Sequence, residues 1–316
     1  MTYSSIRRLS FYIILLVLSG CGNKKTTLTT GEFKLSVPGG QIWYKISGTG
    51  KAIPVVLIHG GPGYSSFYLK PFEELGNERQ VIRYDQLGGG KSDKVTDTAL
   101  FTIDHFVNEL DLLRTHLGLD KWNVLGHSWG TVIALEYYRA HPDRVTSLTF
   151  GSLCFDVPGW SRSTRKLLTT LPDSLQDAVK IAESTGIYDD PAYLAAMNQF
   201  YSLYLFRNPV QADLDSMDAT YNPEIYTYMW GPSEFTITGT LKDYNPIPFL
   251  PEIQVPTLFT VGEFDEINPT IVKELADKVQ GSTYFMFTGS SHMTPWDARD
   301  ENIKVVRDFL NSIDNK

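Results

Sequence analysis

The pentapeptide Gly126-His127-Ser128-Trp129-Gly130 joins an apolar run, WNVL, to a helix-like run, TVIALEYYRA. A turn this tight brings backbone segments close together, and glycines placed two residues before and after the serine relieve the crowding. The same turn lifts the Ser128 hydroxyl clear of the backbone, and the helix that follows offers free N–H groups to a developing oxyanion. The pattern predicts a serine nucleophile at a strand-to-helix turn.

Strand-like and helix-like segments alternate along the chain from residue 33. Residues 54–58, PVVLI, form a short unbroken apolar run, which is typical of a strand covered on both faces. The alternation predicts an α/β fold, a mostly parallel sheet with helices on both faces. We expect strands at residues 33–37, 41–47, 54–58, 80–84, 122–125, 145–150, 257–261 and 283–287, and helices from Thr102 to Gly118 and at 131–140, 269–279 and 298–313.

This pattern is interrupted between residues 153 and 252, where strand-like runs vanish. Aromatic residues make up 13 of the 62 residues from Tyr188 to Phe249, and most of them are expected to form the core of a small helical layer. We therefore expect an α/β core in two parts, residues 33–152 and 253–316, with an inserted helical cap at residues 153–252. Helix-compatible stretches in the cap lie at 161–171, 173–185 and 192–206.

The amino terminus has the features of an export signal. Arg7 and Arg8 precede an apolar run from Leu9 to Leu18, and small residues follow. The run is too short for a membrane-spanning helix, which needs about 20 apolar residues. The tetrad Leu18-Ser19-Gly20-Cys21 resembles the lipobox of bacterial lipoproteins, which implies cleavage before Cys21 and lipidation of that residue. An ordinary cleaved signal with an incidental cysteine is the alternative.

These features predict a signal peptide at residues 1–20 and a polar tether at residues 21–32, rich in Thr and Lys. We expect an exported protein, a lipid-anchored bacterial lipoprotein on the periplasmic or outer side of a membrane. The membrane is then a partner through the anchor. Cys154 is left as a lone thiol and is expected to be buried and inert.

Composition argues against several classes of function. Lys and Arg total 28 against 36 Asp and Glu, a formal charge of −8 without a basic run, which disfavours nucleic acid as a partner. Two cysteines allow neither a disulfide framework nor a CxxC zinc site, and the six histidines form no HExxH pair. We expect no metal site and no cofactor.

A serine nucleophile needs a base, usually histidine, that is oriented by a carboxylate. His292 lies in the loop GSSHM after the last expected strand, where side chains from strand ends converge. Asp265 follows the strand TLFTV in the turn GEFDEINP, and Asp85 and Asp297 are the alternative acids. The other five histidines are expected to have other roles, and His127, beside Ser128, should point away from the nucleophile.

A second glycine-rich loop, His59-Gly60-Gly61-Pro62-Gly63, follows the run PVVLI. Its three glycines let bare backbone approach a substrate. The N–H of Gly61 can form an oxyanion hole together with the N–H of Trp129.

Five motifs together resemble the proline iminopeptidases, a family of α/β-hydrolases. They are HGGPG at 59–63, YDQLGGGKSD at 84–93, GHSWG at 126–130, GPSEFTITG at 231–239 and GEFDE at 262–266. The likeness runs from about residue 35 to the end, and one departure is His127, where many members carry glycine. The resemblance implies an α/β-hydrolase fold in which Ser128 is the nucleophile, His292 the general base and Asp265 its orienting acid.

The resemblance also implies how substrate is held. Related enzymes bind the free amino group of the substrate with one carboxylate in the cap and one just after the triad acid, and the matching positions are Glu234 and Glu266. This has physical sense, because a desolvated ammonium needs negative partners at close range.

The implied activity is that of a serine exopeptidase, an aminopeptidase that releases N-terminal residues, preferentially proline, from short peptides through an aminoacyl-enzyme intermediate. One alternative is a small-molecule esterase or amidase with the same triad and no free-amine recognition. The other is a non-catalytic binding protein on a decayed hydrolase scaffold, although such scaffolds usually lose a triad member and all three candidates are present here.

Overall fold

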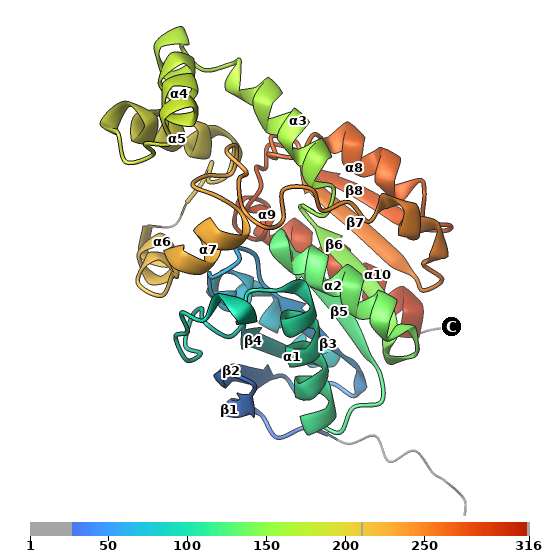
Figure 1. Ribbon diagram of the computed structural model, residues 1–316. Helices are drawn as coiled ribbons and strands as arrows, with labels where there is room; N and C mark the ends of the chain where they lie inside the picture. The colour runs from blue at the N-terminus through green and yellow to red at the C-terminus, as the bar shows by residue number, and fades with distance from the viewer. Residues whose placement is uncertain (1–26, 210, 315–316) are drawn as a thin grey trace, which may run out of the picture.

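The computed structural model describes residues 27–209 and 211–314 and is built on an eight-stranded sheet (Figure 1). The strand order is β1-β2-β4-β3-β5-β6-β7-β8. β2 pairs antiparallel with both β1 and β4, whereas every pair from β4 to β8 is parallel. The strands are β1 Gly31–Val37, β2 Gly40–Ser47, β3 Ala52–Ile58, β4 Arg79–Asp85, β5 Trp122–His127, β6 Val145–Gly151, β7 Thr257–Gly262 and β8 Thr283–Phe287.

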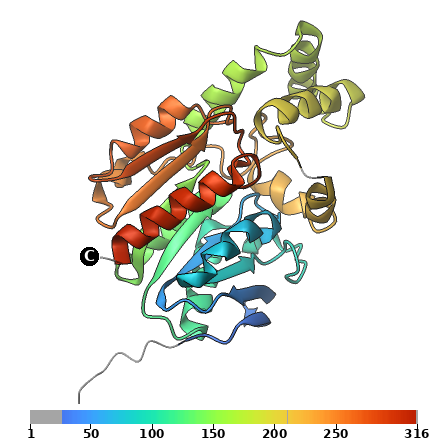
Figure 2. The ribbon, with the colours of Figure 1, turned by 180° about the vertical axis from the view of Figure 1, so that it is seen from behind.

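Helices cover both faces of this sheet. α1, α2 and α8 lie on the face seen in Figure 1, and α10 lies with the 3₁₀ helix η1 on the face seen in Figure 2. Each interface has its own cluster of buried apolar side chains, with Leu110 and Ile133 in one and Phe72 and Val306 in the other. The prediction of a mostly parallel α/β sheet covered on both faces is confirmed. These helices are η1 Ser66–Asn77, α1 Ile103–His116, α2 Trp129–Ala140, α8 Pro269–Ala276 and α10 Arg299–Asp314.

Helix α1 shows how local sequence sets these boundaries. The Thr102 hydroxyl accepts a hydrogen bond from the His105 N–H and caps the first turn. Phe106 and Leu110 form part of an apolar stripe that is buried against the sheet. The chain leaves the helix at Gly118, whose φ of +65° suits glycine.

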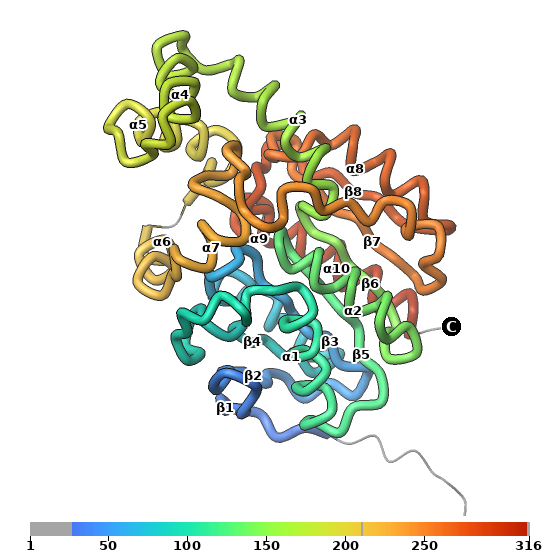
Figure 3. Tube along the Cα trace, in the orientation of Figure 1, coloured from blue at the N-terminus to red at the C-terminus, as the bar shows by residue number. Residues whose placement is uncertain are grey.

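The segment from residue 153 to 252, which the sequence predicts to be the cap, has no strand among its described residues and is mostly helical. The tube in Figure 3 leaves the sheet after β6 and returns before β7. Val179, Phe200 and Phe235 belong to a third apolar cluster, most of which lies within this segment. Its helices are α3 Val157–Leu168, α4 Asp173–Thr185, α5 Pro191–Tyr204, α6 Gln211–Asp218, α7 Pro223–Met229 and the 3₁₀ helix η4 Ile247–Glu252.

Some short elements were not expected. η1 contains Pro71, which has no N–H and obscures a helical pattern. α6 reads QADLDSMD and buries only Met217, so it lacks an apolar stripe. The last predicted helix is preceded by a separate turn, α9 Thr294–Asp297, and two further short 3₁₀ turns are η2 Thr98–Leu100 and η3 Pro142–Arg144.

The start of the described chain is tied to the sheet. The Leu28 N–H donates to Oε1 of Gln80 at 2.7 Å, and Nε2 of Gln80 donates to the Leu28 carbonyl at 2.8 Å. β1 begins at Gly31, so the last residues of the expected tether are held in the fold. The expected signal peptide and Cys21 lie outside the described residues. Within the described ranges, no helix is both long and apolar enough to span a bilayer.

Candidate active site

Ser128 occupies a strained turn between β5 and α2. Its φ of 53° and ψ of −127° are rare for a residue other than glycine. A Cβ on Gly126 would lie 2.2 Å from the Gly130 carbonyl oxygen, and a Cβ on Gly130 would lie 2.1 Å from that of Ile58. The two glycines are therefore required by the close approach of the backbone around the serine, as the sequence predicts.

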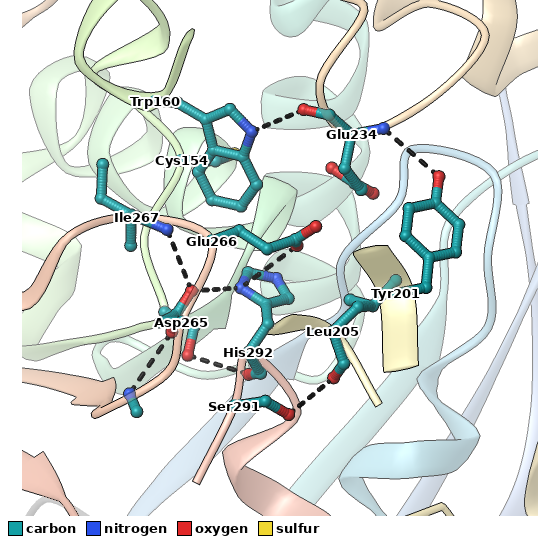
Figure 4. A network of polar contacts seen from close by, with 12 residues as sticks. Cys154, Trp160, Tyr201, Leu205, Glu234, Asp265, Glu266, Ile267, Ser291 and His292 are labelled. Carbon is teal, nitrogen blue, oxygen red and sulfur yellow. Dashed lines mark hydrogen bonds and ion pairs between the residues drawn. The ribbon is translucent and has the colours of Figure 1, made fainter. Parts of the chain in front are cut away.

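His292 and Asp265 form a buried pair at the carboxyl edge of the sheet (Figure 4). Nδ1 of His292 lies 2.8 Å from Oδ1 of Asp265, and the backbone N–H groups of Gly262 and Ile267 donate to the same carboxylate at 3.3 Å. The Asp265 carboxylate therefore accepts the hydrogen on Nδ1 and leaves Nε2 as the ring nitrogen that can exchange a proton with a substrate or nucleophile.

Ser128 and His292 line the same cavity, which has a volume of about 30 Å³. The structure thus brings the three predicted triad residues to one place, although among the described residues no hydrogen bond joins the serine hydroxyl to the imidazole. Such contacts often tighten only when substrate is bound. The cavity is lined by Gly60, Gly61, Tyr64, Tyr68, His127, Ser128, Leu205, Phe206, Met217, Glu234, His292 and Met293.

The two alternative acids have other partners. Asp85 accepts hydrogen bonds from the backbone N–H groups of Ser66 and Lys91 and stabilises the loops there. The Asp297 carboxylate accepts from the Ser291 N–H at 2.7 Å and from the Asn208 N–H at 3.0 Å. Neither carboxylate is hydrogen-bonded to the His292 ring, so Asp265 is the acid that contacts the imidazole.

The proposed oxyanion donors are free to receive a ligand. Within the described part of the chain, the backbone N–H groups of Gly61 and Trp129 have no hydrogen-bond acceptor. The neighbouring Gly60 N–H, in contrast, donates to the Tyr68 hydroxyl at 2.6 Å. Gly61 has a φ of +119°, a conformation that favours glycine.

His127 extends this contact to the base. The Tyr68 hydroxyl donates to Nδ1 of His127, and Nε2–H of His127 donates to the His292 carbonyl, both at 3.0 Å. Burial lowers the pKa of His127 to about 3, with the nearby charge of His292 acting in the same direction, so the ring is neutral near pH 7. A chain of hydrogen bonds therefore connects Gly60 of the glycine-rich loop to the His292 loop, and His127 serves the scaffold as a link.

Glu234 reaches the cavity from the cap. Its Oε1 accepts a hydrogen bond from the Tyr226 hydroxyl at 2.7 Å. Its backbone N–H donates to the Tyr201 hydroxyl at 3.3 Å (Figure 4). Trp160 donates its indole N–H to the Glu234 carbonyl at 2.9 Å. Burial raises the pKa of Glu234, which means that a cationic partner would stabilise its charged form.

Glu266 is fully buried and does not line the cavity. Its Oε2 lies 3.8 Å from Nδ1 of His292, and neither carboxylate oxygen has a hydrogen-bond partner among the described residues. Burial raises its pKa well above the usual value, and the charges of Glu234 and Asp265 raise it further. An unpartnered buried acid is costly, so this side chain is one for which a bound cation would supply the missing partner.

Several cavity residues could not be named from the sequence. Leu205, Phe206 and Met217 come from the cap, whose aromatic richness was the only signal for them. Cys154 is buried as expected, and burial raises the pKa of its thiol. Over the described ranges, no group of three or more His, Cys, Asp or Glu side chains is arranged to hold a metal ion.

Known proteins resemble this chain over most of its length. The family model described as alpha/beta hydrolase fold matches residues 53–298. A proline iminopeptidase from Heyndrickxia coagulans is 38% identical over 282 residues, which cover 88% of this chain and 98% of the relative. Among solved structures, VinJ gives a TM-score of 0.84 and the proline iminopeptidase of Mycobacterium smegmatis gives 0.81; each is 30% identical and covers 90% of this chain and 99% of its own.

Proposed function

This chain belongs to the proline iminopeptidase family of α/β-hydrolases, and on that basis we propose that it is a serine exopeptidase that releases N-terminal residues, proline in preference, from short peptides. The observation that carries the proposal is the Asp265–His292 pair, joined at 2.8 Å, in contact with a cavity that also contains the Ser128 hydroxyl. This arrangement supports acyl transfer through a serine nucleophile.

In the proposed reaction, Nε2 of His292 accepts the Ser128 proton as the hydroxyl attacks the first peptide carbonyl. The N–H groups of Gly61 and Trp129 stabilise the oxyanion, and Asp265 stabilises the imidazolium that forms. His292 then gives the proton to the leaving amine. Water, activated by the same imidazole, hydrolyses the aminoacyl-enzyme.

Exopeptidase specificity requires that the substrate amine be recognised. We propose that Glu234 and Glu266 bind the free ammonium, so that only the first peptide bond reaches Ser128. The burial that raises the pKa of both carboxyl groups supports this role, because a bound ammonium would compensate for the loss of water around them. The cap residues around Glu234 restrict access to chain ends.

Activity on aminoacyl-arylamides, each with and without N-acetylation, tests the proposal. Ser128→Ala should abolish turnover while its circular dichroism matches the parent, and Ser202→Ala, an exposed serine on α5, should leave turnover unchanged. Retained turnover in Ser128→Ala would overturn the assignment. Equal turnover of free and N-acetylated substrates, with faster cleavage of simple esters, would favour the esterase alternative.

We also propose that the chain is exported and anchored to a membrane by lipid on Cys21. The support is the sequence alone: two arginines, an apolar run and the tetrad that ends at Cys21. The anchor would hold the peptidase on the periplasmic or outer side of a membrane, where short peptides pass.

A further inference from the structure

Gln86 belongs to the motif at residues 84–93, to which the proposed chemistry gives no role. It follows β4 directly and is 1% exposed. Its backbone N–H donates to Nε2 of His59 at 3.0 Å, and its side-chain Nε2 donates to the His59 carbonyl at 2.9 Å. Its Oε1 accepts from the indole N–H of Trp129 at 2.9 Å. One buried side chain thus contacts both segments that carry the proposed oxyanion donors.

The contacts with His59 orient the first donor. Because the Gln86 N–H can only donate, Nε2 of His59 accepts, and the ring proton must be on Nδ1. That N–H donates to the Gly60 carbonyl at 2.7 Å. The Gly60 carbonyl and the Gly61 N–H belong to one planar peptide group, so fixing the carbonyl also fixes the direction of the N–H.

The contact with Trp129 orients the second donor. The Trp129 side chain is fully buried and packs edge-to-face on Phe106, with ring centroids 5.8 Å apart. Its indole N–H has Gln86 as its acceptor. The Trp129 side chain is therefore fixed by its packing on Phe106 and by its hydrogen bond to Gln86. This also fixes the direction of the Trp129 backbone N–H, the first of α2.

We propose that Gln86 is a positioning residue that aligns the Gly61 and Trp129 N–H groups on one oxyanion. The inference rests on the proposed function, because it takes these two groups as the oxyanion donors. Donors that are aligned in advance stabilise charge that develops in the transition state and contribute little to binding of the substrate. Loss of the Gln86 side-chain bonds should therefore lower kcat and leave KM nearly unchanged.

A matched pair of variants, one in β4 and one directly after it, tests this. Gln86→Met removes the side-chain hydrogen bonds to the His59 carbonyl and the Trp129 indole, keeps the backbone N–H bond to Nε2 of His59, and has similar length. Gln80→Met likewise removes side-chain hydrogen bonds at the other end of the strand, where a glutamine that is 3% exposed bonds the backbone of Leu28, away from the cavity. Removing one oxyanion donor costs about 100- to 1,000-fold in kcat, so misaligned donors should cost about 10- to 100-fold in Gln86→Met. Gln80→Met should keep the parental kcat.

A second measurement separates alignment from general destabilisation. An amino aldehyde forms a hemiacetal with Ser128 and places an oxygen in the oxyanion hole, so its inhibition constant should rise in Gln86→Met by a factor similar to the fall in kcat. A simple amine inhibitor should bind as it does to the parent. If Gln86→Met does not fold, Gln86→Glu serves instead, because it keeps the acceptor for Trp129 and sets a carboxylate oxygen against the His59 carbonyl.

The inference is overturned if the Gln86 variant has the kcat of Gln80→Met, or if only its KM changes. Failure of the proposed function looks different, since the parent protein would then not cleave aminoacyl-arylamides, or Ser128→Ala would still do so. An active parent with an unaffected Gln86 variant rejects the positioning role alone.

Discussion

The two glutamates, Glu234 at the cavity and Glu266 buried behind it, differ in how many hydrogen-bond donors the fold gives them. The Glu234 carboxylate has the Tyr226 hydroxyl as a donor, whereas the Glu266 carboxylate has no donor among the described residues. A ligand that supplies N–H donors and positive charge would therefore stabilise the Glu266 carboxylate more than the Glu234 carboxylate.

Replacing either Glu234 or Glu266 by glutamine should weaken the binding of substrates that have a free amine. A charged hydrogen bond is worth about 1.5–3 kcal/mol, so KM for aminoacyl-arylamides should rise by about 10- to 100-fold. N-blocked esters, which have no ammonium, should keep their KM. Steady-state kinetics on both substrate types measure this, and an equal loss on both would contradict the amine-binding role.

Glu109 on α1 is a buried acid outside the cavity. Its Oε2 accepts from the Leu87 N–H at 3.0 Å, and Oε1 has no partner in the described structure. Burial raises the pKa of Glu109 from 4.5 to about 8. The folded state thus keeps a proton that the unfolded state loses between these values, and stability should fall as pH rises through this range.

Glu109→Gln should remove this dependence. The slope for one proton is about 1.4 kcal/mol per pH unit. The free energy of unfolding of the variant should therefore rise relative to that of the parent between pH 4.5 and 8, and the difference should stay constant above pH 8. Urea unfolding at several pH values measures the difference. Parallel stability curves for variant and parent would show that Glu109 ionises normally.

The candidate catalytic residues could be proposed from the sequence because their motifs are local. Ser128, Asp265 and His292 each follow a strand in a recognisable turn, and parallel strands bring such turns to one edge. Tyr68 and Gln86 could not be assigned, because their partners are distant in sequence and the hydrogen bonds depend on the folded register. The same holds for Leu205, which reaches the cavity from a segment without motif.

Among the elements, the loop that carries His292 is stabilised by hydrogen bonds to the neighbouring helix α9. The Asp297 carboxylate at the end of α9 accepts from the N–H and the hydroxyl of Ser291 and from the N–H of Asn208. This contact fixes the residue before His292 to the chain that follows α5.

Asp297→Asn should loosen that loop, because one acceptor oxygen becomes a donor facing other donors. Displacements near 1 Å at a catalytic group cost about 100-fold, so kcat should fall by about 10- to 100-fold without loss of the fold. Asp277→Asn, which removes an exposed ion pair with Lys273, is the control and should have parental kinetics. An unchanged kcat in Asp297→Asn would show that the loop holds its position without this carboxylate.

Elements with strong patterns were predictable and irregular ones were not. The buried strands read as apolar runs, and α4 was expected over the same residues as observed, 173–185. η1 and α6 were not expected, since a proline in one and polar residues in the other hide the helical period. The division into core and cap at residues 153 and 252 remains a prediction.

At the scale of the whole molecule, the described chain enters the sheet at one edge and the candidate active site lies at the opposite edge. β1 is parallel to β4, because both pair antiparallel with β2, so the described chain enters at the edge opposite the carboxyl ends that carry Ser128 and His292. In Figures 1 and 2, β1 lies far from the cap helices α4 and α5. The proposed lipid anchor would then be joined to the fold through the edge of the sheet that lies away from the cavity.

The proposed anchor predicts where the activity is found. Cells that produce the full chain should retain peptidase activity in the membrane fraction, and labelled palmitate should mark the protein. Cys21→Ala should lose the label and release active enzyme, because the catalytic residues are unchanged. Fractionation with the Cys154→Ala variant is the control, since that thiol is buried. Equal release of parent and Cys21→Ala would favour the ordinary cleaved signal.

The junction between α5 and the base has a consequence for how such an enzyme can diversify. The His292 N–H donates to the Tyr204 carbonyl at 2.9 Å, and the Met293 N–H donates to the Leu205 carbonyl at 3.2 Å. Main-chain bonds of this kind survive most side-chain substitutions. The end of α5, where Leu205 lines the cavity, and the loop that carries His292 therefore move together. Mutations that reshape the end of α5 to admit new substrates will therefore tend to change the reaction rate as well. Substrate range and catalytic rate are then hard to improve independently of each other.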